Sequence, residues 1–214
     1  MIATRRDWMR CLLAAAAAAA LAAVAGCSFT RPSPVKETFV LEPAYPPVAA
    51  KPQPGLLRVG TLTVGAPFRG RSFVFRESDL QYETDYYHEF LVAPAANIGE
   101  ATARALSAAK VFASVAPAGV VVDPDWILEG FVESLYGDAR DMAKPVAVLT
   151  ITYYLRHGDG DAGVPIWSRR YERRVPFTAG NTSAYVVALN GALGDILVEL
   201  ARDLSAVSLP PLKP

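Results

Sequence analysis

The chain has 214 residues, of which 21 are basic and 21 are acidic, so its formal net charge is zero. This balance excludes a protein that binds nucleic acid mainly through a basic surface. The 52% share of apolar residues excludes a disordered tail. Two cysteines are too few to form a disulfide scaffold in a chain of this length, which suits one domain with additional segments.

The first 27 residues have the pattern of a bacterial lipoprotein signal. Three arginines lie among the first ten residues, and residues 11–25 carry no charge. This apolar run is too short for a membrane-spanning helix, which takes about 20 residues. It ends in Val24-Ala25-Gly26-Cys27, a lipobox, in which small residues admit a peptidase and the cysteine thiolate attacks the lipid donor. We therefore expect cleavage between Gly26 and Cys27 and attachment of acyl chains such as palmitate to Cys27.

The residue after the lipobox cysteine predicts the destination. In Gram-negative bacteria, aspartate at this position retains a lipoprotein in the inner membrane, so Ser28 favours the outer membrane, facing the periplasm. The pair Arg5-Arg6 loosely resembles a twin-arginine signal, and ordinary Sec export is the interpretation we favour. Removing residues 1–26 leaves 188 residues with a net charge of −2 and Cys27 as the one cysteine. The mature chain therefore has neither a disulfide nor a cysteine-based metal site.

Proline content divides the mature chain. Residues 27–54 contain seven prolines, which favour an extended tether. One strand-like stretch, Thr38–Leu41, interrupts the tether, and we expect it to pair with the sheet. The folded domain is expected over residues 55–207, followed by an irregular tail at residues 208–214.

The hydrophobic pattern predicts one α/β domain. Two amphipathic helices are expected, from Pro94 to about Ala109 and over residues 183–204. The stretch from Val146 to Arg156 alternates apolar and polar residues, and a glycine-rich loop joins it to the next strand, which indicates a hairpin. The predicted strands are 56–64, 72–75, 80–83, 111–115, 126–136, 146–156 and 164–175. We therefore predict an α/β (α+β) two-layer sandwich: a mostly antiparallel or mixed sheet with two amphipathic helices packed on it.

No catalytic pattern is present in the sequence. The two histidines, His88 and His157, are too few and too far apart to predict a triad or a zinc site. A metal site formed by Asp85, His88 and Glu89 is the alternative to solvent-facing polar residues, which we favour. The two aspartates in the loop 157–163 lack the closing acidic residue of a calcium site. We expect no enzyme, no metal and no cofactor.

Two groups of side chains are candidates for partner contacts. Residues 73–90 are rich in aromatic side chains, divided between core and exposed positions. The candidate contacts from this segment are Tyr82, Tyr86 and Tyr87. In the strand 164–175, alternation places Arg170 and Arg174 on one face with Glu172 between them. They are candidates for contact with lipid headgroups or an acidic partner, and a solvated face with charges of both signs is the alternative.

Spaced hydrophobic and aromatic residues along the mature chain carry a family resemblance. After the lipobox these marks are Phe39-Val40-Leu41, Tyr82-Glu83, Tyr86-Tyr87, Phe90 to Pro94, Val111-Phe112, Val115, Leu128, Gly130, Val132, Tyr136, Asp138, Ala147 to Leu155, Trp167, Tyr171 and the closing helix. With them the chain resembles the ABC-type transport auxiliary lipoprotein family, which includes the paraquat-inducible protein C type. The family often has an Arg-Trp pair where this chain has Glu89-Phe90, which indicates a subgroup.

The resemblance implies a function in the cell envelope. It implies a non-enzymatic, outer-membrane lipoprotein that serves an ABC permease and ATPase together with an MCE-domain (mammalian-cell-entry) protein in lipid transport between membranes. It implies no catalytic residue and leaves a homo-oligomer open. A structural or regulatory lipoprotein that contacts cell-wall machinery is the alternative function. The two unpaired histidines count against a lipid-anchored hydrolase.

Overall fold

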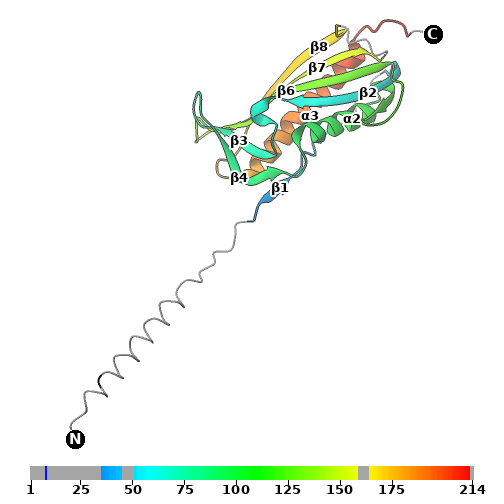
Figure 1. Cartoon of the computed structure of the whole chain (residues 1–214). Helices are drawn as coiled ribbons and strands as arrows, with labels where there is room; N and C mark the ends of the chain where they lie inside the picture. The colour runs from blue at the N-terminus through cyan, green and yellow to red at the C-terminus, as the bar shows by residue number, and fades with distance from the viewer. Residues whose placement is uncertain (1–7, 9–34, 45–50, 159–163, 213–214) are drawn as a thin grey trace. The chain divides into compact units, whose positions relative to one another are not determined.

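The computed structural model describes residue 8 and residues 35–44, 51–158 and 164–212, and the folded domain begins at Lys36 (Figure 1). The expected cleavage site at Gly26 and Cys27, the sorting residue Ser28 and the aspartates of the loop 157–163 lie outside the described residues.

The described domain contains eight strands, two α-helices and one 3-10 helix. The strands are β1 (Glu37–Phe39), β2 (Gln53–Val64), β3 (Ser72–Arg76), β4 (Tyr82–Phe90), β5 (Phe112–Ala116), β6 (Trp126–Asp138), β7 (Val146–His157) and β8 (Trp167–Pro176). The helices are η1 (Ala66–Phe68), α2 (Pro94–Ala108) and α3 (Thr182–Ala206). This confirms the predicted α/β class and both predicted helices. Strand β4 runs to Phe90, well beyond the predicted end at Glu83, and β8 begins later than expected.

Local sequence explains where the helices begin. Pro94 occupies the first turn of α2, where its missing N–H would have no intrahelical partner. The side chain of Asn181 caps α3 by accepting a hydrogen bond from the backbone N–H of Ala184 at 2.9 Å.

Strand β6 is the centre of a mixed sheet. Its first half pairs in parallel with β2, its last two residues pair in parallel with β3, and its other edge pairs antiparallel with β7. Strand β5 lies outside β2, β8 lies outside β7, and β4 and β1 follow β3. The predicted β7–β8 hairpin is confirmed, with Val146 opposite Pro176 and Leu155 opposite Trp167. Four of the seven pairings are parallel, so the sheet is mixed rather than mostly antiparallel.

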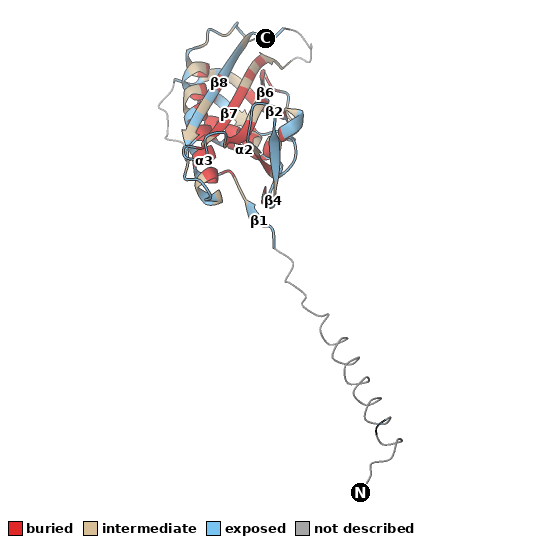
Figure 2. Cartoon of the chain, turned by 90° about the vertical axis from the view of Figure 1, so that its left-hand side faces the viewer, coloured by how far each residue is buried: buried red, intermediate tan, exposed pale blue. Residues whose placement is uncertain are grey.

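Both α-helices cover the same face of the sheet, so the domain has two layers with the buried residues between them (Figures 1 and 2). Ile98, Ala101 and Ala105 of α2 are buried, which confirms its predicted apolar face. Among the described residues, α3 is the one helix long and apolar enough to cross a membrane, and 61% of its most apolar window is buried inside the domain. It therefore packs as a core helix here.

Part of the predicted tether packs on the domain. Strand β1 pairs in parallel with β4, which confirms the pairing expected for the strand-like stretch. The following residues 40–44, called the strap here, lie against the helices. Leu41 is fully buried, and its backbone N–H and C=O both bond to the side-chain amide of Asn97, at 2.8 and 2.9 Å. The backbone carbonyl of Ala44 lies so close to Gly194 of α3 that a Cβ atom there would be 2.6 Å from it.

Candidate functional site

Strand β4 contains a bulge that projects two tyrosines. Where β3 advances by two residues, from Ser72 to Val74, β4 advances by five. The carboxylate of Asp85 holds this bulge by accepting hydrogen bonds from the backbone N–H groups of Tyr87 at 2.8 Å and His88 at 3.1 Å. The rings of Tyr86 and Tyr87 meet edge to face with centroids 5.2 Å apart, and the residues are 66% and 47% exposed. A bulge of this kind redirects side chains away from the sheet, which leaves both rings accessible.

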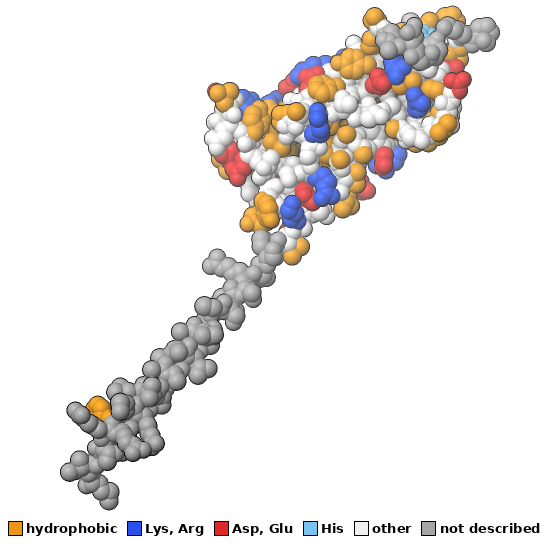
Figure 3. Space-filling view, in the orientation of Figure 1, with side chains coloured by type: hydrophobic (Ala, Val, Ile, Leu, Met, Phe, Trp, Pro, Cys, Tyr) orange, Lys and Arg blue, Asp and Glu red, His pale blue; other side chains and the backbone are white. Residues whose placement is uncertain are grey.

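The bulge forms one wall of a pocket of about 390 Å³, called the acidic pocket here. The connections between β6 and β7 and between β8 and α3 form its other walls. Figure 3 shows acidic and hydrophobic side chains side by side at the end of the domain that carries β3 and β4. The pocket combines three carboxylates with an apolar floor, and the residues are Glu77, Glu83 and Asp85, with Phe75, Met142 and Phe177.

Two of these carboxyl groups face each other. Glu77 follows the last residue of β3 and begins the turn, and Glu83 lies in the neighbouring strand β4. A hydrogen bond with Glu83, together with repulsion from its charge, raises the pKa of Glu77 above its ordinary value. Within the described residues, neither carboxylate has a basic side chain within 4 Å. The pocket therefore presents negative charge without a cation of its own.

Tyr82, the third aromatic candidate, lies in a different environment. It is 43% exposed, and its ring packs against Phe68 and Tyr136 at centroid distances of 6.2 and 5.6 Å. The guanidinium of Arg76 lies 5.6 Å from the ring centroid. Tyr82 therefore supports the β3–β4 hairpin with one side of its ring, and its contact with a partner stays a prediction.

The two arginine candidates lie on the sheet face away from the helices and have ionic partners within the domain. Arg170 contacts Glu133 at 2.7 Å and Glu172 at 3.0 Å, and Arg174 contacts Asp138 at 2.8 Å. Hydrogen bonds from Thr152 and Arg170 lower the pKa of Glu133, although burial acts in the opposite direction. An acidic partner would have to compete with these carboxylates, so the role of both arginines as contacts stays a prediction.

Arg169 and Arg173 confirm the predicted alternation along β8, because they point to the opposite face. Both contact Glu199 of α3, and Arg169 also contacts Asp203 at 2.9 Å. These pairs fasten α3 to the edge strand β8. The four arginines of β8 are therefore divided between two faces of the sheet, and neither pair is an unneutralised cationic patch.

Asp138 is the centre of an ionic cluster at the end of β6. It is 5% exposed and contacts Arg140 at 2.9 Å and Arg174 at 2.8 Å, while Arg140 also contacts Asp79 at 2.9 Å. Hydrogen bonds from Arg140 and Arg174 hold the pKa of Asp138 far below its ordinary value, despite burial. The cluster joins β6, β8 and the β3–β4 turn, and so stabilises the strands that carry the acidic pocket.

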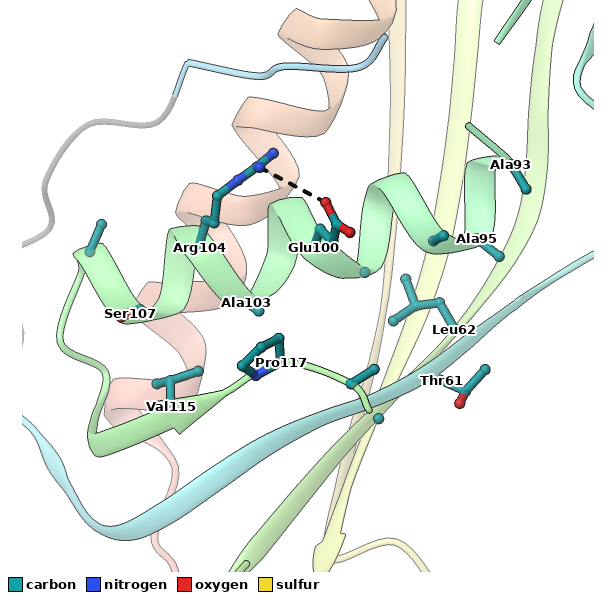
Figure 4. Close-up of a pocket in the computed structure, with 15 residues that line it drawn as sticks. Thr61, Leu62, Ala93, Ala95, Glu100, Ala103, Arg104, Ser107, Val115 and Pro117 are labelled. Carbon is teal, nitrogen blue, oxygen red and sulfur yellow. Dashed lines mark ion pairs between the residues drawn. The ribbon is translucent and has the colours of Figure 1, made fainter. Parts of the chain in front are cut away.

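A larger groove of about 940 Å³ runs along α2, between this helix and the strands β2 and β5 (Figure 4). Small side chains of α2 leave the space open, and the ion pair between Glu100 and Arg104 points away from its floor (Figure 4). The labelled side chains that line its two walls include Thr61, Leu62, Ala95, Ala103, Val115 and Pro117. The lining of this α2 groove suits an apolar ligand or segment.

His88 and Glu89, two residues of the alternative metal site, contact different partners. The ring of His88 contacts Asp85 at 2.7 Å, whereas Glu89 contacts Lys36 and Arg71. His157 lies at the end of β7, with its ring 4.8 Å from that of Trp126. No group of three or more potential metal ligands occurs among the residues that the structure describes.

Sequence patterns did not identify either concave surface. Glu77 lies between the predicted strands 72–75 and 80–83, and its approach to Glu83 depends on the hairpin register, in which Phe75 pairs with Glu83. The small residues of α2 were a signal for the groove, since alanine and glycine recur along that helix. The tyrosines Tyr86 and Tyr87 were identified, but the bulge that exposes them follows from pairing with two strands.

Two solved structures are similar in fold. Protein XCC0632 from Xanthomonas campestris, of the DUF330 family, is 18% identical over 78% of this chain and 90% of its own, with a TM-score of 0.61. An uncharacterized protein is 18% identical over 79% of this chain and 99% of its own, with a TM-score of 0.62. No curated protein matches the chain at a significant level.

The model of one protein family covers most of the chain. It matches residues 39–201, from β1 through most of α3, and so includes the strap, both helices and every other strand described above. The family is described as the ABC-type transport auxiliary lipoprotein component. This chain belongs to that family.

Proposed function

We propose that this chain is a non-enzymatic lipoprotein of the outer membrane that faces the periplasm and serves an MCE/ABC-type system for lipid transport between membranes. Membership of the transport auxiliary family carries the proposal. The lipobox supports the anchor at Cys27, and Ser28 supports outer-membrane sorting. The partners are an MCE-domain protein and its permease and ATPase.

The docked strap supports a short connection between anchor and domain. Only nine residues lie between Cys27 and Glu37, where β1 begins. Fully extended, the ten steps from Cys27 to Glu37 span at most about 36 Å. The seven prolines therefore do not all lengthen the tether, because the strap continues from β1 onto the helices. The domain is held near the membrane, at the end of any bridge that crosses the periplasm.

The accessible surfaces support a binding role rather than catalysis. The concave features described here are an apolar groove and a pocket with carboxylates and tyrosines. His88 is held in the β4 bulge by Asp85, and His157 packs against Trp126. Both histidines therefore have structural contacts.

Anchoring is tested by the variant Cys27→Ser. We expect it to lose palmitate labelling and to leave the outer-membrane fraction, whereas Ser28→Asp should keep its acyl chains and move to the inner membrane. Ser28→Thr is the control that should remain in the outer membrane. A Cys27→Ser chain that is processed normally and stays in the outer membrane would refute the anchor.

The transport role is tested by crosslinking in intact cells, followed by purification in detergent. We expect an MCE-domain protein to be recovered with the acylated chain. Recovery of peptidoglycan-synthesis proteins in its place would support the alternative envelope role. Recovery of the chain alone would contradict the transport proposal.

A further inference from the structure

The acidic pocket has an excess of negative charge that the domain itself does not neutralise. Among the residues that line it, all of them within the described part of the chain, three are carboxylates and none is lysine, arginine or histidine. Asp85 is occupied by the backbone of the bulge and by His88. Glu83 is the one ionisable group that shifts the pKa of Glu77. A cation from outside would relieve their repulsion.

The remaining walls suit the rest of a long basic side chain. Phe75, Met142 and Phe177 provide apolar surface for its methylene groups. Tyr86 and Tyr87 provide ring faces and edges beside the carboxylates, and the ammonium of Lys36 already lies 5.1 Å from the ring centroid of Tyr86. Tyrosine faces attract cations, so this wall is compatible with a positive group.

We propose that the acidic pocket receives an arginine side chain from a partner protein. The planar guanidinium presents five donors in a fixed fork that matches carboxylate geometry and can lie flat on an aromatic ring, whereas a lysine ammonium is a point charge on a flexible stem. The volume of about 390 Å³ accommodates one long side chain and its neighbours. The inference rests on the proposed function, which supplies the partner, the MCE-domain protein. It adds the contact that this partner makes.

Two other occupants fit the pocket less well. A metal ion would need at least three ligands in reach of one another, and the described residues contain no such group. A lipid surface would place Glu77 and Glu83 against apolar chains or phosphate groups, and removing carboxylates from water costs free energy unless they are paired. An arginine removes the same carboxylates from water while pairing them.

The first test compares partner recovery by charge variants. The acylated protein is purified in detergent, and the MCE-domain protein bound to it is quantified. We expect Glu77→Gln combined with Glu83→Gln to weaken binding at least about tenfold. Binding by the wild type should also fall between low and high salt, whereas the double variant should lose this dependence. Glu100→Gln, an exposed acid on the rim of the α2 groove, is the control that should bind normally.

The second test uses a probe and does not depend on the MCE-domain protein. N-acetyl-arginine-N-methylamide is titrated into the isotope-labelled, acylated protein in micelles, and amide shifts are followed by NMR. We expect saturable shifts at Tyr86, Tyr87 and Gly180 that disappear in the double variant. N-acetyl-norleucine-N-methylamide, which is apolar and uncharged, should leave these signals unchanged.

The outcomes separate the inference from the proposed function. Normal partner binding by the double variant, or equal shifts with the norleucine amide, would overturn the arginine pocket. If the arginine amide binds as expected but no MCE-domain protein is recovered with the wild type, the pocket stands and the transport role fails. A nitroxide at Tyr86→Cys that becomes inaccessible to polar quenchers in vesicles would identify the lipid surface as the occupant, and would also overturn the inference.

Discussion

Asn97 connects the strap to helix α2 and provides a direct test of how the N-terminal segment is held. Its side-chain amide accepts a hydrogen bond from the backbone N–H of Leu41 at 2.8 Å and donates one to the carbonyl of Leu41 at 2.9 Å. Both bonds are buried and join residues 56 positions apart. The amide thus takes the place of a neighbouring strand, and Asn97→Ala would remove both partners at once.

The magnitude follows from the groups left behind. A buried backbone donor or acceptor without a partner costs about 1–3 kcal/mol. Two such groups at Leu41 predict a loss of about 3 kcal/mol in the free energy of unfolding. For a domain of this size that corresponds to a fall of roughly 6–12 °C in the melting temperature. Asn97→Asp should be comparably destabilising, because a carboxylate cannot donate to the carbonyl of Leu41.

The assay is urea unfolding followed by tryptophan fluorescence, with trypsin cleavage after Lys36 as a local measure of strap release. Asn190→Ala is the matched control, since its side chain makes a single exposed bond of 2.8 Å to the backbone of Glu42. We expect this control to cost about 0.5 kcal/mol. If Asn97→Ala were no more destabilising than the control, the bidentate bond would not hold the strap and the reasoning would be refuted.

Two further predictions concern α3 and the ionic cluster. Gly194→Ala should cost about 1–3 kcal/mol, because its Cβ would lie 2.6 Å from the carbonyl of Ala44. Gly191→Ala, with nothing within 4 Å, should stabilise the helix by about 0.5–1 kcal/mol, and urea midpoints of the pair measure the contrast. Asp138→Asn should cost about 3 kcal/mol at pH 7, since Arg140 and Arg174 lose a buried partner. The folded pKa of Asp138 is depressed, so its stabilisation is present above the unfolded pKa of about 4 and is lost progressively as pH falls below that value. The difference in urea midpoint between wild type and Asp138→Asn should therefore shrink from pH 5 to pH 3. An unchanged difference would contradict the pairing.

Periodicity was sufficient to predict the main elements of the domain. Apolar residues at helical spacing identified α2 and α3, because these positions face one sheet and are buried together. Alternation identified β7 and β8 and placed Arg170 and Arg174 on one face, since the period of a strand depends only on local backbone geometry. Proline at Pro94 and the cap at Asn181 are likewise local signals.

Long-range pairing could not be predicted in the same way. The parallel contacts of β6 with β2 and β3 join segments far apart in the chain, and no short pattern specifies them. The end of β4 was missed for this reason, because Asp85, Tyr86 and Tyr87 are polar or exposed and do not alternate. The strand continues past them because the residues on either side are paired: residues 82–84 and Glu89 with β3, and residues 88–90 with β1.

The sequence by itself determined the lipobox, the two helices, most strands and the tyrosines that belong to the surface, because these features depend on residue type and short-range spacing. Only the tertiary structure decided how charges and backbone groups are paired. It divided the arginines of β8 between two faces, joined Asn97 to the strap, and brought Glu77 and Glu83 together without a cation. The energy of such groups depends on which distant neighbour reaches them, and that is a property of the folded chain.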